Sequence, residues 1–357
     1  MPSSFYDLLT HNASAPHGVY SPVTLSHEWP KLDRLLFMVC CSVISSIMNG
    51  YFVASFFVEH TLKRLGNAFL ACVGVADMLI TTGVMPMSAV VLLSGEWDLL
   101  PVCQSLHFLT EASTYSYSIF FALAAGECYY RVCGTSSEYD MIFSMRIGCL
   151  SIIVFCVSVV VAGVGVFMDL DYDYCERKHF GNFYFRIITF VILHVIPMLL
   201  TIFGFVTSLT TIRKKSRDQT QYKRSQQFDR DYSAASLNLV AYLLYILAWI
   251  PYLIIVLEFP STSDSKFYYS AWIGISRSAI TSFLYCAANR NYRRAFAHLF
   301  NYCCCKSSLS SSFGGRHRRD YYRPSCDVRV HIMHKAVNSH SPQRHRAAST
   351  CRETQDL

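Results

Sequence analysis

Seven long runs of apolar residues dominate the chain, and short polar stretches separate them. Each run is long enough for an α-helix to cross the hydrocarbon core of a bilayer, which takes about 20 residues. None shows the alternating pattern of a membrane-spanning β-strand, so the backbone polar groups must be satisfied within helices. The runs lie at about 35–58, 67–93, 103–133, 145–167, 184–212, 236–259 and 267–288. The pattern predicts an all-α membrane protein, a bundle of seven transmembrane helices.

The composition agrees with a protein that lies in lipid. Of its 357 residues, 52% are hydrophobic and only 15% are charged, which is too apolar for an ordinary soluble protein. The sequence contains no metal-ligand spacing, nucleophile elbow or phosphate-binding loop, so we expect neither an enzyme nor a cofactor. The net charge of +7 arises mainly in loops and a tail that we place in the cytoplasm, where membrane lipids and not nucleic acid are the expected partner.

Lysine and arginine are concentrated in some connections between the runs and scarce in others. The first connection carries Lys63 and Arg64, and the fifth, at 213–230, is densely basic, whereas the second and fourth are rich in acidic residues. The positive-inside rule therefore places the N-terminus outside the cell and the C-terminus in the cytoplasm of a multi-pass plasma-membrane protein. Asn12 begins an Asn-Ala-Ser glycosylation acceptor on the predicted outer side.

Two of the fifteen cysteines fall on the predicted outer, oxidising side. Cys103 heads the third run and Cys175 lies in the long fourth connection, so we expect them to form a disulfide. Near the other end of the chain, an amphipathic stretch at 289–300 predicts a short eighth helix, and three consecutive cysteines follow it. Their juxtamembrane position predicts palmitoylation of Cys303, Cys304 and Cys305.

Several motifs, in order and at matching spacing, give the chain a resemblance to a known family. They are Asn49, Ala76-Asp77, Trp97 before Cys103, Pro197, Ala248-Trp249-Ile250-Pro251, and the stretch from Tyr285 to Arg293. Across about residues 33–305 the chain resembles rhodopsin-like G-protein-coupled receptors. Gly95 to Leu99, His194 near Pro197, and Asn289 to Tyr292 are similar to melatonin receptors.

The resemblance implies a receptor that transmits an extracellular ligand signal across the membrane by helix rearrangement, to a heterotrimeric G protein, to arrestin or to both. It implies an extracellular segment at 1–33, a receptor domain with helix 8 at 34–300, and a cytoplasmic tail at 301–357 that we expect to be disordered. Two alternatives stay open. One is a receptor-like protein with altered or absent G-protein coupling, acting as an arrestin-biased receptor, a scavenger or a heteromer partner. The other is a transporter or channel, although the sequence shows no paired broken helices or inverted repeat.

Two prolines within the runs predict flexible points. Pro197 and Pro251 each remove a helix hydrogen bond and permit a kink. Trp249 precedes Pro251 by two residues, where its ring either transmits a push from a ligand or simply belongs to the core.

A charged pair is expected inside the membrane. Asp77 corresponds to an aspartate that helps hold sodium in the family, and a carboxylate at this depth needs a partner. The family's Asn-Pro-x-x-Tyr reads Thr281-Ser282-Phe283-Leu284-Tyr285 here, and Arg277 stands one turn earlier. We expect the Arg277 guanidinium to replace the cation beside Asp77, with Tyr117 filling the adjacent space. Alternatively, Arg277 faces a water-filled cavity and contacts a ligand.

The inner end of the third run also departs from the family. Glu127-Cys128-Tyr129 stands where the family has an acid, an arginine and a tyrosine, and Phe205 replaces a tyrosine that commonly meets that arginine. Arg131 lies four residues after Glu127, on the same helical face, so the two can form a salt bridge in place of the missing contact.

The ligand is less constrained. Thr110 occupies the position where amine receptors carry aspartate, although Glu111 is adjacent, and Ile275 occupies the position of a retinal lysine. The resemblance therefore disfavours a biogenic amine and a light receptor. Six residues are candidates for a mixed apolar and polar cavity, although packing or a lipid contact explains each one equally well; they are His107, Thr110, Glu111, Tyr115, His194 and Trp272.

Overall fold

A computed structural model of the chain describes residues 31–59, 62, 65–94, 99–134, 147–170, 172–173, 175, 178–179, 183–258 and 264–305. The chain divides into two compact units, Met1–Ala297 and His298–Leu357, and each is described by itself. Asn12, Trp97 and the tail beyond Cys305 lie outside the described residues, as do the side chains of Cys303, Cys304 and Cys305.

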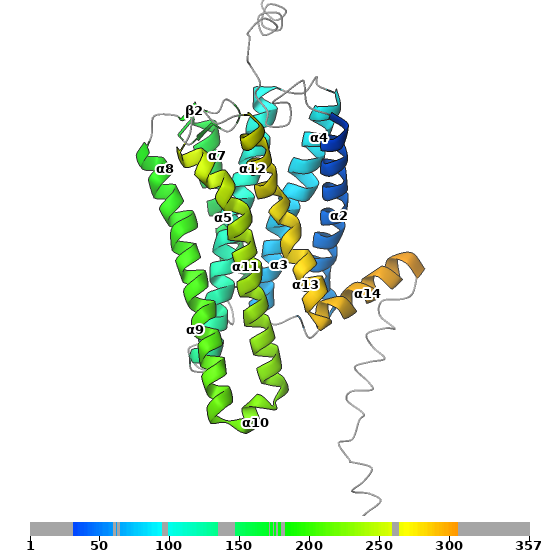
Figure 1. Cartoon of the computed structure of the whole chain (residues 1–357), viewed down its shortest axis with the longest axis vertical. Coiled ribbons are helices and arrows are strands. Elements are labelled where there is room, and N and C mark those ends of the chain that lie inside the picture. Colours follow the sequence, from blue (N-terminus) through cyan, green and yellow to red (C-terminus); the bar gives the residue numbers. More distant parts are fainter. Residues whose placement is uncertain are drawn as a thin grey trace, which may run out of the picture. The chain divides into compact units, whose positions relative to one another are not determined.

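The described chain is almost entirely helical, and each of the seven predicted runs corresponds to one helical stretch (Figure 1). The first four are α2 (Lys31–Val58), then α3 (Leu65–Met78) with η3 (Leu79–Val84) and α4 (Met85–Ser94), then α5 (Leu100–Cys133), and α7 (Ile147–Phe167). The others are α8 (Phe183–Phe190) with η4 (Val191–Val195) and α9 (Ile196–Asp218), then α11 (Gln226–Glu258), and α12 (Asp264–Ser276) with η5 (Arg277–Ala279) and α13 (Ile280–Ala288). The connection after α7 contains a short antiparallel pair, β1 (Tyr172–Asp173) and β2 (Lys178–His179).

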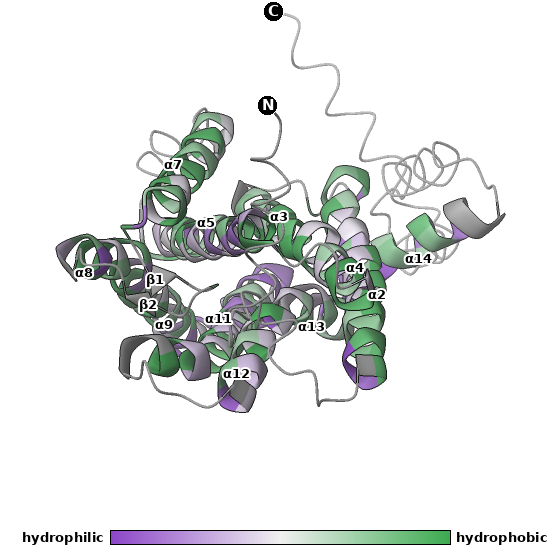
Figure 2. Ribbon diagram, turned by 90° about the horizontal axis from the view of Figure 1, so that it is seen from above, coloured by the Kyte–Doolittle hydropathy of each residue, from purple (hydrophilic) through white to green (hydrophobic). Residues whose placement is uncertain are grey.

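Five of these stretches are long and apolar enough to cross a membrane by length and composition alone. The stretches α5 and α12–α13 fall short because they are more polar. Helix α5 contacts α3, α7, α9 and α11, and it buries a run of small hydroxyl residues that includes Ser113, Thr114, Ser116 and Ser118. Seen from above, the hydrophobic residues lie mainly on the outer helices (Figure 2). Polar side chains are tolerated in α5 because protein, and not lipid, surrounds it.

Within the described helical stretches, three short segments depart from α-helical geometry. The π-helical segments η3 and η4 precede Pro86 and Pro197, which cannot donate a backbone hydrogen bond. The 3₁₀ segment η5 begins at Arg277. Pro251, by contrast, lies inside α11 without ending it. Two of the three irregular segments therefore lie beside the charged residues Asp77 and Arg277.

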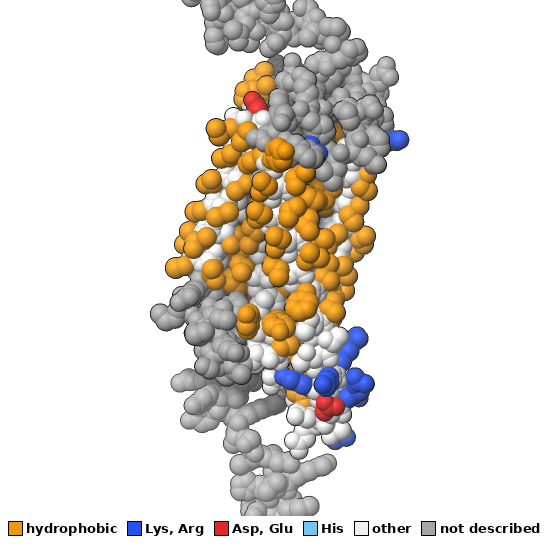
Figure 3. Space-filling model, turned by 90° about the vertical axis from the view of Figure 1, so that its left-hand side faces the viewer, with side chains coloured by type: hydrophobic (Ala, Val, Ile, Leu, Met, Phe, Trp, Pro, Cys, Tyr) orange, Lys and Arg blue, Asp and Glu red, His pale blue; other side chains and the backbone are white. Residues whose placement is uncertain are grey.

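The fifth connection is helical over most of its length. Helix α9 continues to Asp218, a single turn α10 (Thr220–Lys223) follows, and α11 begins at Gln226. The backbone N–H of Phe228 donates to the Ser225 hydroxyl at 3.2 Å, which caps the start of α11. Both helices thus extend beyond the predicted runs. Figure 3 shows Lys and Arg side chains gathered at this end of the bundle, below a broad band of hydrophobic side chains.

A helix also occupies the place predicted for the eighth helix. Helix α14 (Arg290–Cys305) begins after Asn289, whose side-chain oxygen accepts a hydrogen bond from the N–H of Asn291 at 2.9 Å. Tyr292 and Ala295 are buried, whereas Arg293 is exposed. The helix is therefore amphipathic, and its position along a membrane surface stays a prediction.

Candidate functional site

One end of the bundle is tied by a disulfide. Cys103, in the first turn of α5, is bonded to Cys175 in the connection that carries β1 and β2, and their Cα atoms are 6.0 Å apart. Both residues are buried. The bond fixes this connection to the central helix.

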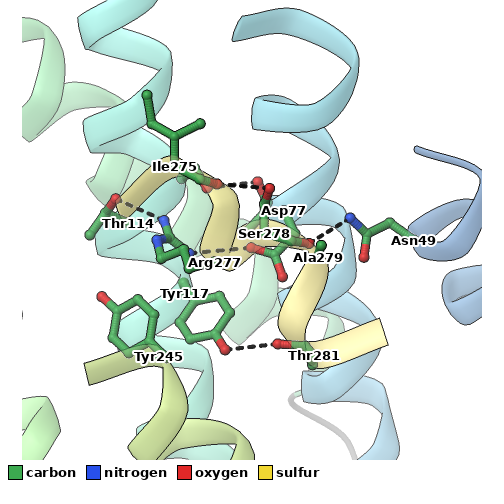
Figure 4. Close-up of polar contacts among 12 residues, drawn as sticks. Asn49, Asp77, Thr114, Tyr117, Tyr245, Ile275, Arg277, Ser278, Ala279 and Thr281 are labelled. Atoms are coloured by element: carbon green, nitrogen blue, oxygen red, sulfur yellow. Dashed lines mark hydrogen bonds and ion pairs between the residues drawn. The ribbon is translucent and has the colours of Figure 1, made fainter. Parts of the chain in front are cut away.

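Arg277 and Asp77 form an ion pair in the middle of the bundle (Figure 4). A terminal guanidinium nitrogen of Arg277 donates to Asp77 Oδ1 at 3.3 Å, and the other donates to Thr114 Oγ1 at 2.9 Å. Both charged side chains are 0% exposed. Because burial of a lone ion in lipid costs several kcal/mol, about 3 or more, each of these charges requires the other.

Aromatic rings surround the same guanidinium. Its central carbon lies 4.9 Å from the ring centres of Tyr117 and Tyr245, and 5.4 Å from that of Trp249. Cation–π attraction on desolvated rings contributes about 1–2 kcal/mol each. Gly274 makes room for Trp249, because a Cβ there would lie 2.7 Å from the indole ring. Trp249 therefore contacts the charged pair and does not pack only against apolar neighbours.

Further hydrogen bonds join this pair to the neighbouring helices. Asn49 in α2 donates to the Ser278 carbonyl at 2.9 Å, and the hydroxyls of Tyr117 and Thr281 lie 2.8 Å apart. Ser282 instead donates to the Ala279 carbonyl within its own helix. We call Asp77, Thr114, Tyr117, Arg277 and Thr281 the polar cluster.

Sequence reasoning missed two members of this neighbourhood. Thr114 lies one turn before Tyr117 on α5, and Tyr245 lies one turn before Trp249 on α11. Helical periodicity around the residues already singled out is the signal that could have found them.

A second charged group lies at the other end of α5. Arg131 Nε is 3.3 Å from Glu127 Oε1, and a terminal nitrogen of Arg131 donates to Asp231 Oδ1 at 3.1 Å. Asp231 lies in α11 and was not singled out in the sequence. We call Glu127, Arg131 and Asp231 the inner ion-pair cluster. It joins α5 to α11 through an arginine that stands three residues after Cys128.

Residues of α9 and α10 make further contacts with the inner end of α5 and with the inner ion-pair cluster. Lys215 of α9 donates to the carbonyl of Val132 in the last turn of α5 at 2.6 Å. Burial raises the pKa of Tyr222 in α10, and the Asp231 carboxylate raises it further. The α9–α10–α11 hairpin is thus held against α5 by charge as well as by packing.

The residues at the family's arginine and tyrosine positions are apolar here and lie in the core. Cys128 is 2% exposed and Phe205 is 0% exposed, and both belong to one hydrophobic cluster. Tyr129 is half-buried and its ring lies 6.2 Å from that of Phe203. Tyr285 donates a hydrogen bond to the side-chain oxygen of Asn238 in α11.

Four of the six predicted ligand residues, His107, Thr110, Glu111 and Tyr115, lie on α5, and their role in ligand binding stays a prediction. The rings of Tyr115 and His194 are in contact, with centres 5.4 Å apart. The Thr110 hydroxyl donates to the Leu106 carbonyl of its own helix. Trp272 lines a cavity between α2 and α12. His107 is buried, and Glu111 is half-buried.

Comparison with known proteins gives the same family as the motifs. A family model described as "7 transmembrane receptor (rhodopsin family)" matches residues 48–289. The chain is 22% identical to a D(1)-like dopamine receptor of Oreochromis mossambicus, over 73% of this chain and 76% of that receptor. It is 20% identical to the histamine H2 receptor of Homo sapiens, over 84% of this chain and 87% of that receptor. The same receptor of Cavia porcellus is also 20% identical, over 79% of this chain and 84% of that receptor.

These findings establish the family but do not test the likeness to one of its subgroups. The likeness to melatonin receptors stays a prediction, because these relatives are receptors of other kinds. The matched region contains Asn49, the polar cluster and the inner ion-pair cluster. The chain belongs to the rhodopsin family of seven-transmembrane receptors, which are cell-surface receptors that signal through G proteins and are not enzymes.

Proposed function

We propose that this receptor resides in the plasma membrane with its N-terminus outside, binds a ligand near the Cys103 end of the bundle, and releases the inner ion-pair cluster when it is activated. The disulfide lies at one end of α5, whereas the exposed basic residues of the α9–α10–α11 hairpin lie at the other. This distribution supports the proposed orientation, because disulfides form on the oxidising side and basic loops stay in the cytoplasm.

One observation carries the proposal for activation: Arg131 bridges α5 and α11. Any movement of α11 away from α5 must break the hydrogen bond to Asp231. Arg131 is 29% exposed, so each of its ion pairs contributes only about 0.5–1 kcal/mol. A ligand that favours the open arrangement by a similar amount shifts the population several-fold. Arg131, three residues after Cys128, thus holds α5 and α11 together in the inactive receptor, a role that the Cys128 thiol cannot fill.

The polar cluster supplies the connection between the outer and inner halves. Arg277 contacts Asp77 on α3, Thr114 on α5 and the Trp249 ring on α11. A ligand that displaces Trp249 therefore alters the surroundings of a buried charge. We propose that Arg277 serves as a built-in cation, where relatives of this family hold sodium, and that this receptor responds to its ligand independently of sodium.

Basal signalling tests the restraining role of Arg131 without a known ligand. We expect Asp231→Asn and Arg131→Ala to raise ligand-independent G-protein activation about two- to five-fold in cells, because loss of about 1 kcal/mol changes an equilibrium about five-fold. Lys214→Ala, an exposed basic residue on the same hairpin, is the matched control and should leave it unchanged. Unaltered basal activity across a panel of G proteins, at equal surface expression, would refute the proposal.

The names of the relatives suggest amine ligands, but the geometry favours another class. Thr110 presents a hydroxyl that is already bonded to its own helix, and it offers no carboxylate to pair with an ammonium group. We expect dopamine and histamine to leave G-protein activation unchanged at concentrations that saturate those relatives. A robust response to either amine would instead assign Glu111 the role of counter-ion.

A second candidate function rests on Cys128. A buried thiol cannot extend toward a G protein as an arginine can. This observation favours a receptor with altered coupling that acts through arrestin, as a scavenger or as a heteromer partner. Arrestin recruitment or constitutive internalisation without G-protein activation, in the wild type and in Arg131→Ala alike, would support this alternative.

A further inference from the structure

We propose that the cavity between α2 and α12 binds a single-chain phospholipid with a zwitterionic head group, of the lysophosphatidylcholine class, which enters sideways from the outer leaflet. The placement of this cavity in the outer leaflet rests on the orientation given under the proposed function. We call this space the α2–α12 cavity. Its position differs from that of Thr110, where an amine would bind in the relatives.

The α2–α12 cavity has the size and lining of a small-molecule site. Its volume is about 520 Å³, within the range of about 300–1,000 Å³ that is typical of ligand pockets. The walls are mostly apolar or aromatic, and charged residues stand near its two ends. The lining residues that carry the argument are Asp33, Arg34, Phe37, Trp272, Ile273 and Arg277.

Its side walls face the bilayer. Phe37 is 45% exposed, Ile273 is 49% exposed and Tyr269 is 62% exposed, and all three lie on the helices α2 and α12. Residues this apolar and this exposed in a membrane protein contact hydrocarbon. The cavity is therefore open to a molecule that diffuses within the leaflet, and an acyl chain is the natural occupant of its apolar part.

The polarity along the cavity matches an amphiphile. Asp33 and Arg34 lie in the first turn of α2, at the level of the lipid head groups, and Phe37 lies one turn deeper. On α12, Tyr268 and Tyr269 precede Trp272 and Ile273 by one turn. A lipid whose head group stays at this level would place its chain along Phe37 and Ile273.

The charges at the mouth favour a zwitterion. The Arg34 guanidinium lies 5.5 Å from the Tyr268 ring centre, and a guanidinium binds phosphate through paired hydrogen bonds. The Asp33 carboxylate and the neighbouring tyrosine rings suit a quaternary ammonium group. A fatty acid or a lysophosphatidic acid offers no cation for Asp33, and a sterol offers no anion for Arg34. Opposite charges on adjacent residues thus favour a zwitterionic head group, of which phosphocholine is the proposed example.

Trp272 packs closely into one wall of the cavity. Trp272 is 4% exposed and its indole N–H has no hydrogen-bond partner among the described residues. Its ring is held edge-on against Phe37, with centres 6.5 Å apart. The indole nitrogen itself is not accessible from the cavity. Trp272 therefore contributes an aromatic ring, packed beside Phe37, to the apolar wall.

A ligand in the α2–α12 cavity would contact a residue of the polar cluster. Arg277 lines the cavity and is also the partner of Asp77. Trp272 lies five residues before Arg277 on the same helical stretch. A lipid bound here therefore packs against the helical stretch that positions the Arg277 guanidinium. Without the lipid, that stretch would be more mobile.

Binding to the purified full-length receptor tests the inference. Native mass spectrometry and thermal unfolding would be measured with palmitoyl-lysophosphatidylcholine, and with palmitate, lysophosphatidic acid and cholesterol as comparators. We expect saturable binding and a raised Tm with lysophosphatidylcholine. Ile273→Trp, which fills the cavity, should abolish binding, whereas Leu199→Trp, an equally lipid-exposed site on α9, should not.

Other outcomes overturn the assignment. Equal binding by wild type and Ile273→Trp would remove the site from this cavity, provided that both proteins unfold at similar temperatures. Tighter binding of palmitate, lysophosphatidic acid or cholesterol would refute the zwitterionic head group. Because these measurements need no G protein, a negative result leaves the Arg131 proposal standing, and altered basal signalling in the Arg131 variants says nothing of the lipid.

Discussion

Arg277 and Asp77 lie 200 residues apart in the sequence, yet a guanidinium nitrogen of one meets a carboxylate oxygen of the other at 3.3 Å with no solvent exposure on either side chain. The pair depends on both partners, because each charge alone would be buried without compensation.

Replacing Arg277 by serine should therefore expose the carboxylate to other cations. We expect Arg277→Ser to lower the free energy of unfolding by about 3–5 kcal/mol, and added sodium to recover part of the loss. Thermal unfolding in NaCl, with N-methylglucamine chloride at equal ionic strength as the control, measures both effects. Asp77→Asn combined with Arg277→Ser should be insensitive to sodium. A wild type that sodium stabilises would refute the idea of a built-in cation.

The hydrogen bond between Tyr117 and Thr281 should contribute measurably to stability. A double-mutant cycle of Tyr117→Phe and Thr281→Val isolates it, and we expect a coupling energy of about 1 kcal/mol for this buried, neutral pair. Each single change should be destabilising, because it leaves the partner's hydroxyl buried without this hydrogen bond. Purely additive effects would mean that the contact does not persist.

Restoring the family's arginine at position 128 should not restore ordinary coupling. Cys128 is 2% exposed and packs in the apolar core, while Glu127 already holds Arg131. We expect Cys128→Arg to lower the Tm and surface expression, and Cys128→Ala, as its control, to lower them far less. Full expression together with increased G-protein activation would show that the inner end can accept a second arginine.

Close packing of α9 on α5 should make Gly204 sensitive to substitution. A Cβ at Gly204 would lie 3.0 Å from the Ala125 carbonyl oxygen, whereas a Cβ at Gly148 in α7 meets nothing within 4 Å. We expect Gly204→Val to cost about 1–3 kcal/mol through overpacking, and Gly148→Ala to be neutral or slightly stabilising. Thermal unfolding of the two variants would reveal the contrast, and equal effects would contradict the packing.

Loss of the disulfide should impair folding in cells. Cys103→Ser and Cys175→Ser each remove a bond that closes 72 residues, and such a loss costs about 2–5 kcal/mol. We expect reduced surface expression for both single variants and no further loss in the double variant. Cys40→Ser, at an exposed free cysteine, is the control. A double variant that is worse than either single would indicate separate roles for the two residues.

The sequence predicted most of what depends on local pattern. The seven spans follow from the length of apolar runs, and the Cys103–Cys175 pairing follows from which loops are basic. Arg131 beside Glu127 follows from helical spacing. These features could be inferred because each depends on residues close together in the chain, or on the side of the membrane that a loop faces. The continuation of α9 and α11 beyond the predicted apolar runs was not predicted, because it depends on the Ser225 cap and on packing between the two helices.

Only the tertiary structure identified the residues that complete each site. Asp231 is one hundred residues from Arg131, and nothing in its local sequence marks it as a partner. Thr114 and Tyr245 reach Arg277 only because α5, α11 and α12–α13 converge at one depth. The α2–α12 cavity likewise forms between the first and last helices of the bundle. Hydrophobic pattern and charge determine which segments enter the membrane, but side-chain contacts between distant helices decide where a buried charge finds its partner.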